Sequence, residues 1–147
     1  MAQEPIQPTL VINSQYIKDL SFEMPHAPEI FAKMKTQPKI NVDVRVQSNK
    51  LAEDSYTVDL NLILNGDIEN EKLFVLELTY SAAAQIKAEP EQIEPILHIE
   101  VSRMIFPFAR NIITQVMMEG GLPPLMLTPI DFVAVYEAHK KRESEEN

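Results

Sequence analysis

The sequence predicts an α+β fold: a four-stranded antiparallel sheet followed by a long kinked helix and a second, C-terminal helix. Segments of alternating apolar and polar residues fill the first part of the chain, and helix-like segments follow them. Strands and helices segregated in this way are typical of α+β domains. A length of 147 residues suits one domain with a hydrophobic core. We therefore expect a single domain over residues 1–147, with flexible tails at about 1–8 and 142–147.

Strict alternation predicts three of the strands. They are KINVDVRVQ (39–47), YTVDLNLIL (56–64) and LFVLELTY (73–80), and each has an apolar residue at every second position. A period of two over this length indicates a sheet with one buried face and one face in water. An earlier strand, within TLVINSQYIKDLSFEMP (9–25), alternates imperfectly near Ser14 and Lys18, which predicts a bulge or bend.

The connections between these segments predict the sheet topology. Asn65 to Asp67 reads NGD, a signal for a hairpin turn, and SNKLAED (48–54) can close a longer hairpin. PHAPEIFAKMKTQP (25–38) is too long for a hairpin, so we expect it to cross over the sheet. The result is a meander of three strands joined by a first strand that crosses over.

The long helix is predicted from near Glu91 to about Glu119. Pro107 has no backbone N–H, so it should kink or break this helix. Gly120 and Gly121 should end it.

The second helix has a clear predicted start. Thr128 is expected as the N-cap, Pro129 as the first helical residue and Asp131 in the reciprocal capping position.

The long helix is apolar on more than one side. One predicted face, which could cover the sheet, consists of Leu97, Val101, Met104, Ile105, Phe108 and Ile112. Further apolar residues lie outside that stripe: Ile99, Phe106, Ile113 and Met117. A helix that is apolar nearly all round is buried on both sides. A chain of this size has no second layer for that purpose, so we expect a homo-oligomer with helices between sheets.

Composition limits the classes of partner. The formal net charge is −9 and the isoelectric point is about 4.8, which argues against nucleic acid or an anionic membrane surface as the main partner. There is no cysteine, which excludes disulfides, thiol redox chemistry and thiolate metal sites. The sequence has no apolar run of the roughly 20 residues needed to cross a membrane, and its start lacks the order of a signal peptide. We expect a cytoplasmic protein without direct membrane insertion.

The sequence gives only weak evidence for catalytic residues. His26, His98 and His139 show no metal-ligand spacing, and we interpret them as surface or interface residues. No serine lies in a nucleophile-elbow context. We expect a protein that is not an enzyme, with no cofactor and no metal.

Two other features suggest binding. Asp19, Glu23 and Glu77 fall on the predicted wet face of the sheet, where they indicate either an ordinary solvated face or an anionic platform for a basic partner. The loop GGLPPLMLTP (120–129) is apolar and rich in proline, and methionines near it could accommodate varied apolar ligands or simply fill the core.

Three stretches of the chain resemble one known family. YIKDLSFEMPHAP (16–28), IFPFARNIITQ (105–115) and EGGLPPLMLTPIDFVAVY (119–136) are similar to motifs of the SecB family of bacterial protein-export chaperones. Their order and spacing agree from about Leu10 to Tyr136. The resemblance implies a SecB-like chaperone domain, assembled as a homotetramer that is a dimer of dimers. It also implies a function: binding unfolded precursor proteins, keeping them export-competent and delivering them to the SecA motor ATPase.

The resemblance also implies site residues. Contacts to SecA fall on Asp19, Glu23, Val75 and Glu77. The groove for unfolded substrate is expected to be lined by Phe22, Phe31, Val42, Val44, Phe106, Leu122, Leu125, Met126 and Leu127.

The chain departs from the family pattern at two places. Val101-Ser102 stands where the family often has Cys-Pro, and Ala82 to Ala84 replace a usual Gly-Ile-Phe. The second change could make part of the groove shallower.

Three other functions stay open at this stage. One is a SecB-like chaperone dedicated to a specific client such as an antitoxin. Another is a small α+β enzyme that uses Glu77 or His98 in an apolar pocket. The third is a purely structural oligomer.

Overall fold

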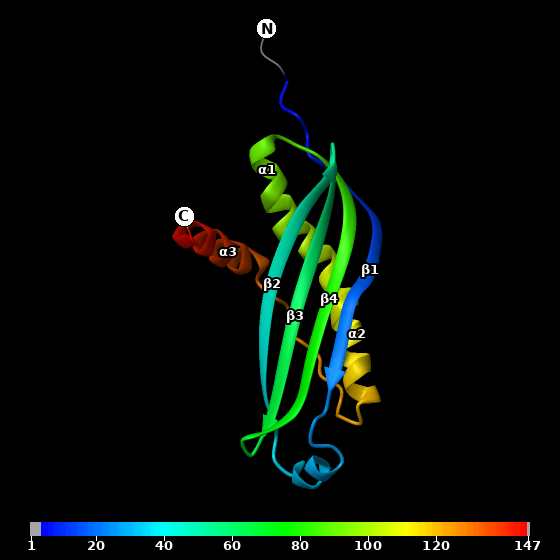
Figure 1. The fold of residues 1–147 in the computed structure, drawn as a ribbon. Coiled ribbons are helices and arrows are strands. Elements are labelled where there is room, and N and C mark those ends of the chain that lie inside the picture. Colours follow the sequence, from blue (N-terminus) through cyan, green and yellow to red (C-terminus); the bar gives the residue numbers. More distant parts are fainter. Residues whose placement is uncertain (1–3, 147) are drawn as a thin grey trace.

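The computed structural model describes residues 4–146 as one antiparallel sheet with helices on one side (Figure 1). The strands are β1 (Thr9–Glu23), β2 (Lys39–Ala52), β3 (Ser55–Ile68) and β4 (Glu71–Lys87). The helical half comprises α1 (Pro90–Pro95), the π-helical segment η2 (Ile96–Val101), α2 (Ser102–Glu119) and α3 (Phe132–Glu146). The predicted α+β class and the number of strands are confirmed. Within the described residues, no helix combines the length and apolar composition that crossing a bilayer requires.

The sheet has the strand order β1-β4-β3-β2, so its topology is the predicted one. β2, β3 and β4 form an antiparallel meander, and β1 pairs with β4 at the far edge. The segment between β1 and β2 crosses the lower end of the sheet and contains a short 3-10 helix, η1 (Glu29–Lys33) (Figure 1).

The irregular first strand contains two bulges. The register between β1 and β4 shifts between Ile12 and Ser14 and again between Ile17 and Asp19. These are the places where the alternation in the sequence fails, so the predicted bulge near Ser14 and Lys18 is confirmed. The bulges let apolar residues on both sides of them face the same side of the sheet.

The hairpin turn predicted at Asn65–Asp67 is wrong in position. β3 continues through Asn65–Asp67, and the turn falls at Glu69 and Asn70, whose φ angles of 50° and 66° match a two-residue hairpin loop. Gly66 lies in the strand opposite Phe74, where a Cβ would come within 2.6 Å of that ring's Cδ1 atom. The glycine therefore makes room for Phe74 and does not mark a turn.

The other hairpin is shorter than predicted. Ala52 pairs with Ser55, so only Glu53 and Asp54 form the loop between β2 and β3.

The core lies between the sheet and the long helical segment. The apolar positions of β3 and β4 are buried as predicted, and the helical segment covers them with Leu97, Val101, Ile105, Ala109 and Ile113. The inward residues of the two strands include Val58, Leu60, Leu62, Leu64, Phe74, Leu76, Leu78 and Tyr80, and β4 continues the set with Ala82, Ala84 and Ile86.

Pro107 does not break the helix, so of the two predicted outcomes, a kink or a break, the break is wrong. α2 runs without a break from Ser102 to Glu119. Pro107 is on the exposed side of α2, so water can solvate the carbonyl group that its missing N–H leaves free. The irregularity comes earlier, where Pro95 ends α1 and η2 continues with π-helical geometry.

The π-helical segment also changes the buried face of the helix. Leu97, Val101 and Ile105 are buried as predicted, but Met104 and Phe108 are exposed. Phe106, Ile113 and Met117, which we placed outside the stripe, are buried instead. A single period of 3.6 residues cannot be extended across a π-helical turn, because the turn rotates every later residue relative to the earlier ones.

The second helix begins later than predicted. α3 starts at Phe132, and the Asp131 side chain accepts a hydrogen bond of 3.1 Å from the Ala134 N–H. Asp131 is therefore the capping residue in place of Thr128, and the helix continues to Glu146. Flexibility of the tails at 1–8 and 142–147 stays a prediction. Residues 1–3 and 147 lie outside the described residues.

Candidate functional site

The outer face of the sheet carries the four predicted SecA contacts on two neighbouring strands. Ser21 pairs with Glu77 and Glu23 pairs with Val75, while Asp19 lies two residues along β1. Asp19, Glu23 and Glu77 are exposed, and Val75 is half-buried. The structure therefore brings all four onto one face, away from the helices.

The charge on this face is unevenly distributed. Among residues 4–146, no lysine or arginine lies within ion-pair distance of Asp19, Glu23 or Glu77. Asp43 on β2 is paired with Arg45 at 3.4 Å. A shallow hollow of about 230 Å³, lined in part by Asp19, Asp43 and Glu77, lies between these strands. The exposed carboxylates are therefore available to a basic partner.

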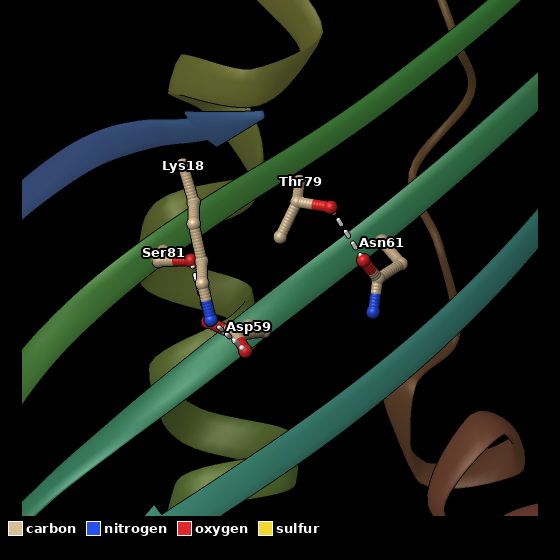
Figure 2. A network of polar contacts seen from close by, with 5 residues as sticks. All are labelled: Lys18, Asp59, Asn61, Thr79 and Ser81. Carbon is tan, nitrogen blue, oxygen red and sulfur yellow. Dashed lines mark hydrogen bonds and ion pairs between the residues drawn. The ribbon is translucent and has the colours of Figure 1, made fainter. Parts of the chain in front are cut away.

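A polar network anchors the bulged part of β1 to the same face (Figure 2). Lys18, the residue at the second bulge, reaches across β4 and forms an ion pair of 3.1 Å with Asp59 on β3. The other carboxylate oxygen of Asp59 accepts a 2.6 Å hydrogen bond from the Ser81 hydroxyl. Farther along the sheet, the Thr79 hydroxyl donates to Asn61 Oδ1 at 2.6 Å. The bulge thus directs Lys18 away from the acidic residues and toward a carboxylate that is only 6% exposed.

The apolar surface gathers at the end of the sheet where the crossover lies. A cavity of about 390 Å³ is formed where the crossover meets the loop after α2, with lining residues Met34, Pro38, Ile40, Leu73, Phe74, Met117, Leu122 and Leu125 among others. A second hollow of about 360 Å³ lies between β1 and α2 and is lined in part by Ile17, Phe22, Ile112 and Val116. Both cavities are suited to apolar side chains.

The loop between α2 and α3 is held by its ends and by one side chain. Gly120 ends α2, Gly121 has a φ angle of 77°, and the Leu122 N–H donates to the Met117 carbonyl at 3.0 Å. This confirms the predicted helix stop. The Thr114 hydroxyl also donates to the Leu125 carbonyl at 2.7 Å, which fixes the middle of the loop to α2.

The nine predicted groove residues differ in exposure. Met126 and Phe31 are exposed to 69% and 39%, and Val42 on the edge strand β2 is also exposed. The half-buried residues are Phe22, Val44 and Leu125. The buried ones are Leu122, which lines the first cavity, together with Leu127 and Phe106, whose ring packs edge-on against Phe132. Ala82 and Ala84 are buried on the covered face of the sheet.

The structure also joins residues that we interpreted as separate. His98 is 2% exposed, and its ring lies 4.7 Å from that of His139, measured between centroids. The interpretation of His98 as a surface or interface residue is therefore wrong within the single chain. Burial, followed by the nearby charge of His139, lowers the pKa of His98 to about 4, while Glu143 acts in the opposite direction. In the sequence, the only signal for this cluster is the spacing of four residues in Glu94/His98 and in His139/Glu143.

The geometry does not favour the enzyme alternative. Glu77 is exposed on the outer face of the sheet, so it does not lie in an apolar pocket. His98 lies in the helical segment on the covered side, where it faces Ser48 and α3.

Comparison with known proteins agrees with the fold and with the motifs. Residues 3–143 match the family model described as preprotein translocase subunit SecB. The protein-export protein SecB of Rhodospirillum rubrum is 45% identical over 130 residues, which cover 88% of this chain and 81% of the relative. That of Granulibacter bethesdensis is 41% identical, with coverage of 95% and 86%.

A solved structure shares the fold at low sequence identity. It is a SecB-like chaperone of Mycobacterium tuberculosis in complex with a peptide from the HigA1 antitoxin, with a TM-score of 0.64 and 13% identity. The alignment covers 82% of this chain and 90% of that one. The solved structure supports the fold, and the family match with the two export relatives shows that the chain belongs to the SecB family and is a chaperone of protein export.

Proposed function

We propose that this chaperone holds unfolded precursor proteins in the cytoplasm as a homotetramer and delivers them to the SecA motor ATPase. Holding is passive: apolar surface binds exposed apolar stretches of a client, and mass action on the unfolded state slows its folding and aggregation. This work requires no covalent chemistry and no cofactor, so the protein is not an enzyme in this proposal. Its partners do not include nucleic acid, and it does not insert into the membrane.

The observation that carries the proposal is the separation of two surfaces on one chain. The exposed carboxylates of Asp19, Glu23 and Glu77 occupy the outer sheet face. The apolar cavities open at the crossover end, between the sheet and the helical layer. A partner that recognises charge and a client that offers apolar side chains can therefore bind at the same time.

The client groove is proposed to start from the two exposed residues at the crossover end. Phe31 and Met126 present side chains next to the cavity lined by Leu122 and Leu125. The loop that carries Met126 is fixed by its prolines and by the bond from Thr114. A loop that is already ordered loses little conformational entropy on binding, which favours affinity. Several such sites on one tetramer would add to the affinity for a long client.

Two exposed apolar surfaces support assembly as a dimer of dimers. The edge strand β1 exposes Val11 and Tyr16 on the outer face of the sheet, and α2 exposes Met104 and Phe108. A tetramer of this kind uses self-complementary contacts of two different types. One strand surface and one helix surface on each chain meet that requirement.

Charge reversal on the sheet face tests the division of labour. We expect Asp19→Lys with Glu77→Lys to weaken SecA binding at least tenfold, because both residues are exposed and lie on neighbouring strands. Holding of an unfolded precursor should remain. A matched control, Glu53→Lys with Glu145→Lys, makes the same change in net charge at exposed positions away from that face. Isothermal titration with SecA and an aggregation assay with a precursor measure the two activities. Loss of holding with intact SecA binding would contradict the proposal.

The complementary variant is Met126→Asp. Because this side chain is exposed, the substitution should leave folding and SecA binding unchanged while it reduces holding. An effect on SecA binding alone would show that the groove does not reach the loop.

A chaperone dedicated to one client remains the alternative. The solved structure with an antitoxin peptide belongs to a protein of the same fold, but its 13% identity to this chain is far below that of the export relatives. Binding of several unrelated unfolded precursors with similar affinity supports the export function. Tight binding of one client and none of the others would favour the alternative.

A further inference from the structure

A polar cavity lies on the other side of the molecule from the acidic face, where α3 meets the helical segment. It has a volume of about 430 Å³ and is lined by Gln47, Ser48, Asn49, Glu94, His98, His139 and Glu143. Neither client holding nor SecA binding, as proposed above, uses these residues. This cavity is therefore separate from both proposed activities.

The cavity gathers four potential metal ligands from the continuous α1–η2 segment and from α3. Glu94 and His98 are four residues apart across α1 and η2, and His139 and Glu143 are four residues apart on α3, so each pair shares one side of its helix. One donor atom from each of Glu94, His98 and His139 lies within 4.8 Å of the other two. His139 Nε2 is 3.1 Å from Glu143 Oε1 and 3.9 Å from Glu94 Oε1.

His98 gives a second, independent sign of a ligand. Its side chain is almost fully buried, its Nε2 atom lies 3.1 Å from the Ser48 hydroxyl, and its Nδ1 atom has no hydrogen-bond partner among the described residues. A buried polar atom without a partner costs free energy, so native proteins rarely keep one without a reason. A cation bound to this Nδ1 atom would give it a partner and remove that cost.

We infer that Glu94, His98 and His139, with Glu143 as a further donor, form a binding site for a divalent transition-metal ion of the Zn²⁺ class. Imidazole and carboxylate ligands suit Zn²⁺, whereas Mg²⁺ and Ca²⁺ prefer sites made of oxygen atoms only. Zinc ligands lie about 2.0–2.2 Å from the metal, so tetrahedral donors are roughly 3.4 Å apart. The donor atoms of Glu94, His98 and His139 lie within 4.8 Å of one another here, so binding of the ion requires these side chains to draw closer together.

The local backbone and the position of the site give the ion a role. His98 lies within the π-helical segment, a geometry that is frequent at functional sites. α3 is anchored to the rest of the chain mainly by its buried residues Phe132 and Tyr136. A bound ion would join the next turn of α3 to η2 and so hold the helix that follows the 120–131 loop.

The test uses the full-length protein after treatment with a chelator and removal of that chelator. Titration with ZnCl₂ should give one ion per chain and raise the midpoint of thermal unfolding, and CoCl₂ should give visible absorption of a low-symmetry site. His139→Gln and Glu94→Gln should each weaken Zn²⁺ binding at least about tenfold. Glu94 is partly exposed, so its variant should fold even if another does not.

His26→Gln is the matched control, since His26 is an exposed histidine outside the cluster. It should bind Zn²⁺ like the parent protein, and MgCl₂ should give no binding. The inference is overturned if the parent chain binds no Zn²⁺ at 100-fold molar excess, if both cluster variants bind as well as the parent, or if His26→Gln is equally impaired.

Discussion

Substitution of Asp59 tests how much this nearly buried carboxylate on the outer sheet face contributes to the stability of the protein. The Asp59→Ala change removes two interactions of unequal value. Ser81 is fully buried, so its hydroxyl loses its acceptor in a place that water does not reach, at a cost of about 1–3 kcal/mol. The Lys18 side chain is 56% exposed, so its ammonium group is rehydrated and the lost ion pair is worth at most about 1 kcal/mol. We expect a total loss of about 3 kcal/mol in the free energy of unfolding.

Two further variants separate these contributions. Asp59→Asn keeps an oxygen acceptor for Ser81 and should cost only about 1 kcal/mol. In the double variant Asp59→Ala/Ser81→Ala the unpaired hydroxyl is gone, so stability should recover by about 1 kcal/mol relative to Asp59→Ala.

Urea unfolding followed by circular dichroism, at one fixed protein concentration, gives the free energies. A loss below about 0.5 kcal/mol for Asp59→Ala would refute the reasoning. An added loss from Ser81→Ala in that background would refute it as well.

Two other predictions follow from close packing and from burial. Gly66→Ala should destabilise the protein by about 1–3 kcal/mol, because the new methyl group meets the buried Phe74 ring. Thermal unfolding measures the loss of stability. An unchanged midpoint of unfolding would show that the ring can move aside. In chelator-treated protein, stability should fall by about 2 kcal/mol from pH 7.5 to pH 5. The reason is that the pKa of His98 is lowered to about 4 in the folded state, so the unfolded state binds more protons below pH 6.5. The titratable groups that face His98 are His139, Glu143, Glu94 and Tyr136. Urea unfolding at both pH values measures the free energy of unfolding, and its difference between the two pH values should be smaller in His98→Gln than in the parent protein.

The sheet was largely predictable because its signal is local. Alternation in β3 and β4 reports directly which side chains are buried, and even the interruptions at Ser14 and Lys18 appear as bulges in the structure. The error in the position of the β3–β4 turn arises because one residue type can serve two structural roles. Gly66 reads as a turn residue, yet it serves the packing of Phe74 across two strands. No single-strand pattern distinguishes these cases.

The helical half shows what local patterns miss. The sequence predicts a kink or a break at Pro107, but the helix continues through it, because the effect of a proline depends on whether its side of the helix faces water. The π-helical segment η2 has no distinct pattern in the sequence, and it shifts the buried face of α2. The buried position of Phe106 against Phe132 follows from that shift.

Of the two candidate sites, the acidic sheet face was predictable from local sequence patterns and the histidine cluster was not. Asp19, Glu23 and Glu77 were placed on one sheet face by strand period alone, and the register confirms their positions. Their role in SecA binding stays a proposal. The meeting of His98 with His139 depends on the direction of α3 after its loop, which is set by contacts distant in sequence. Such a cluster can be found only once the tertiary structure is known.

The strand order has a consequence for folding of the chain during its synthesis on the ribosome. β1 is synthesised before β4, its neighbour in the sheet, and the pair runs from Thr9 opposite Lys87 to Glu23 opposite Val75. Closing this long loop carries a larger entropy cost than forming the tight hairpins of the meander. β1 therefore stays unpaired until β4 has emerged from the ribosome. During its own synthesis this export chaperone therefore passes through a stage in which it presents an open strand.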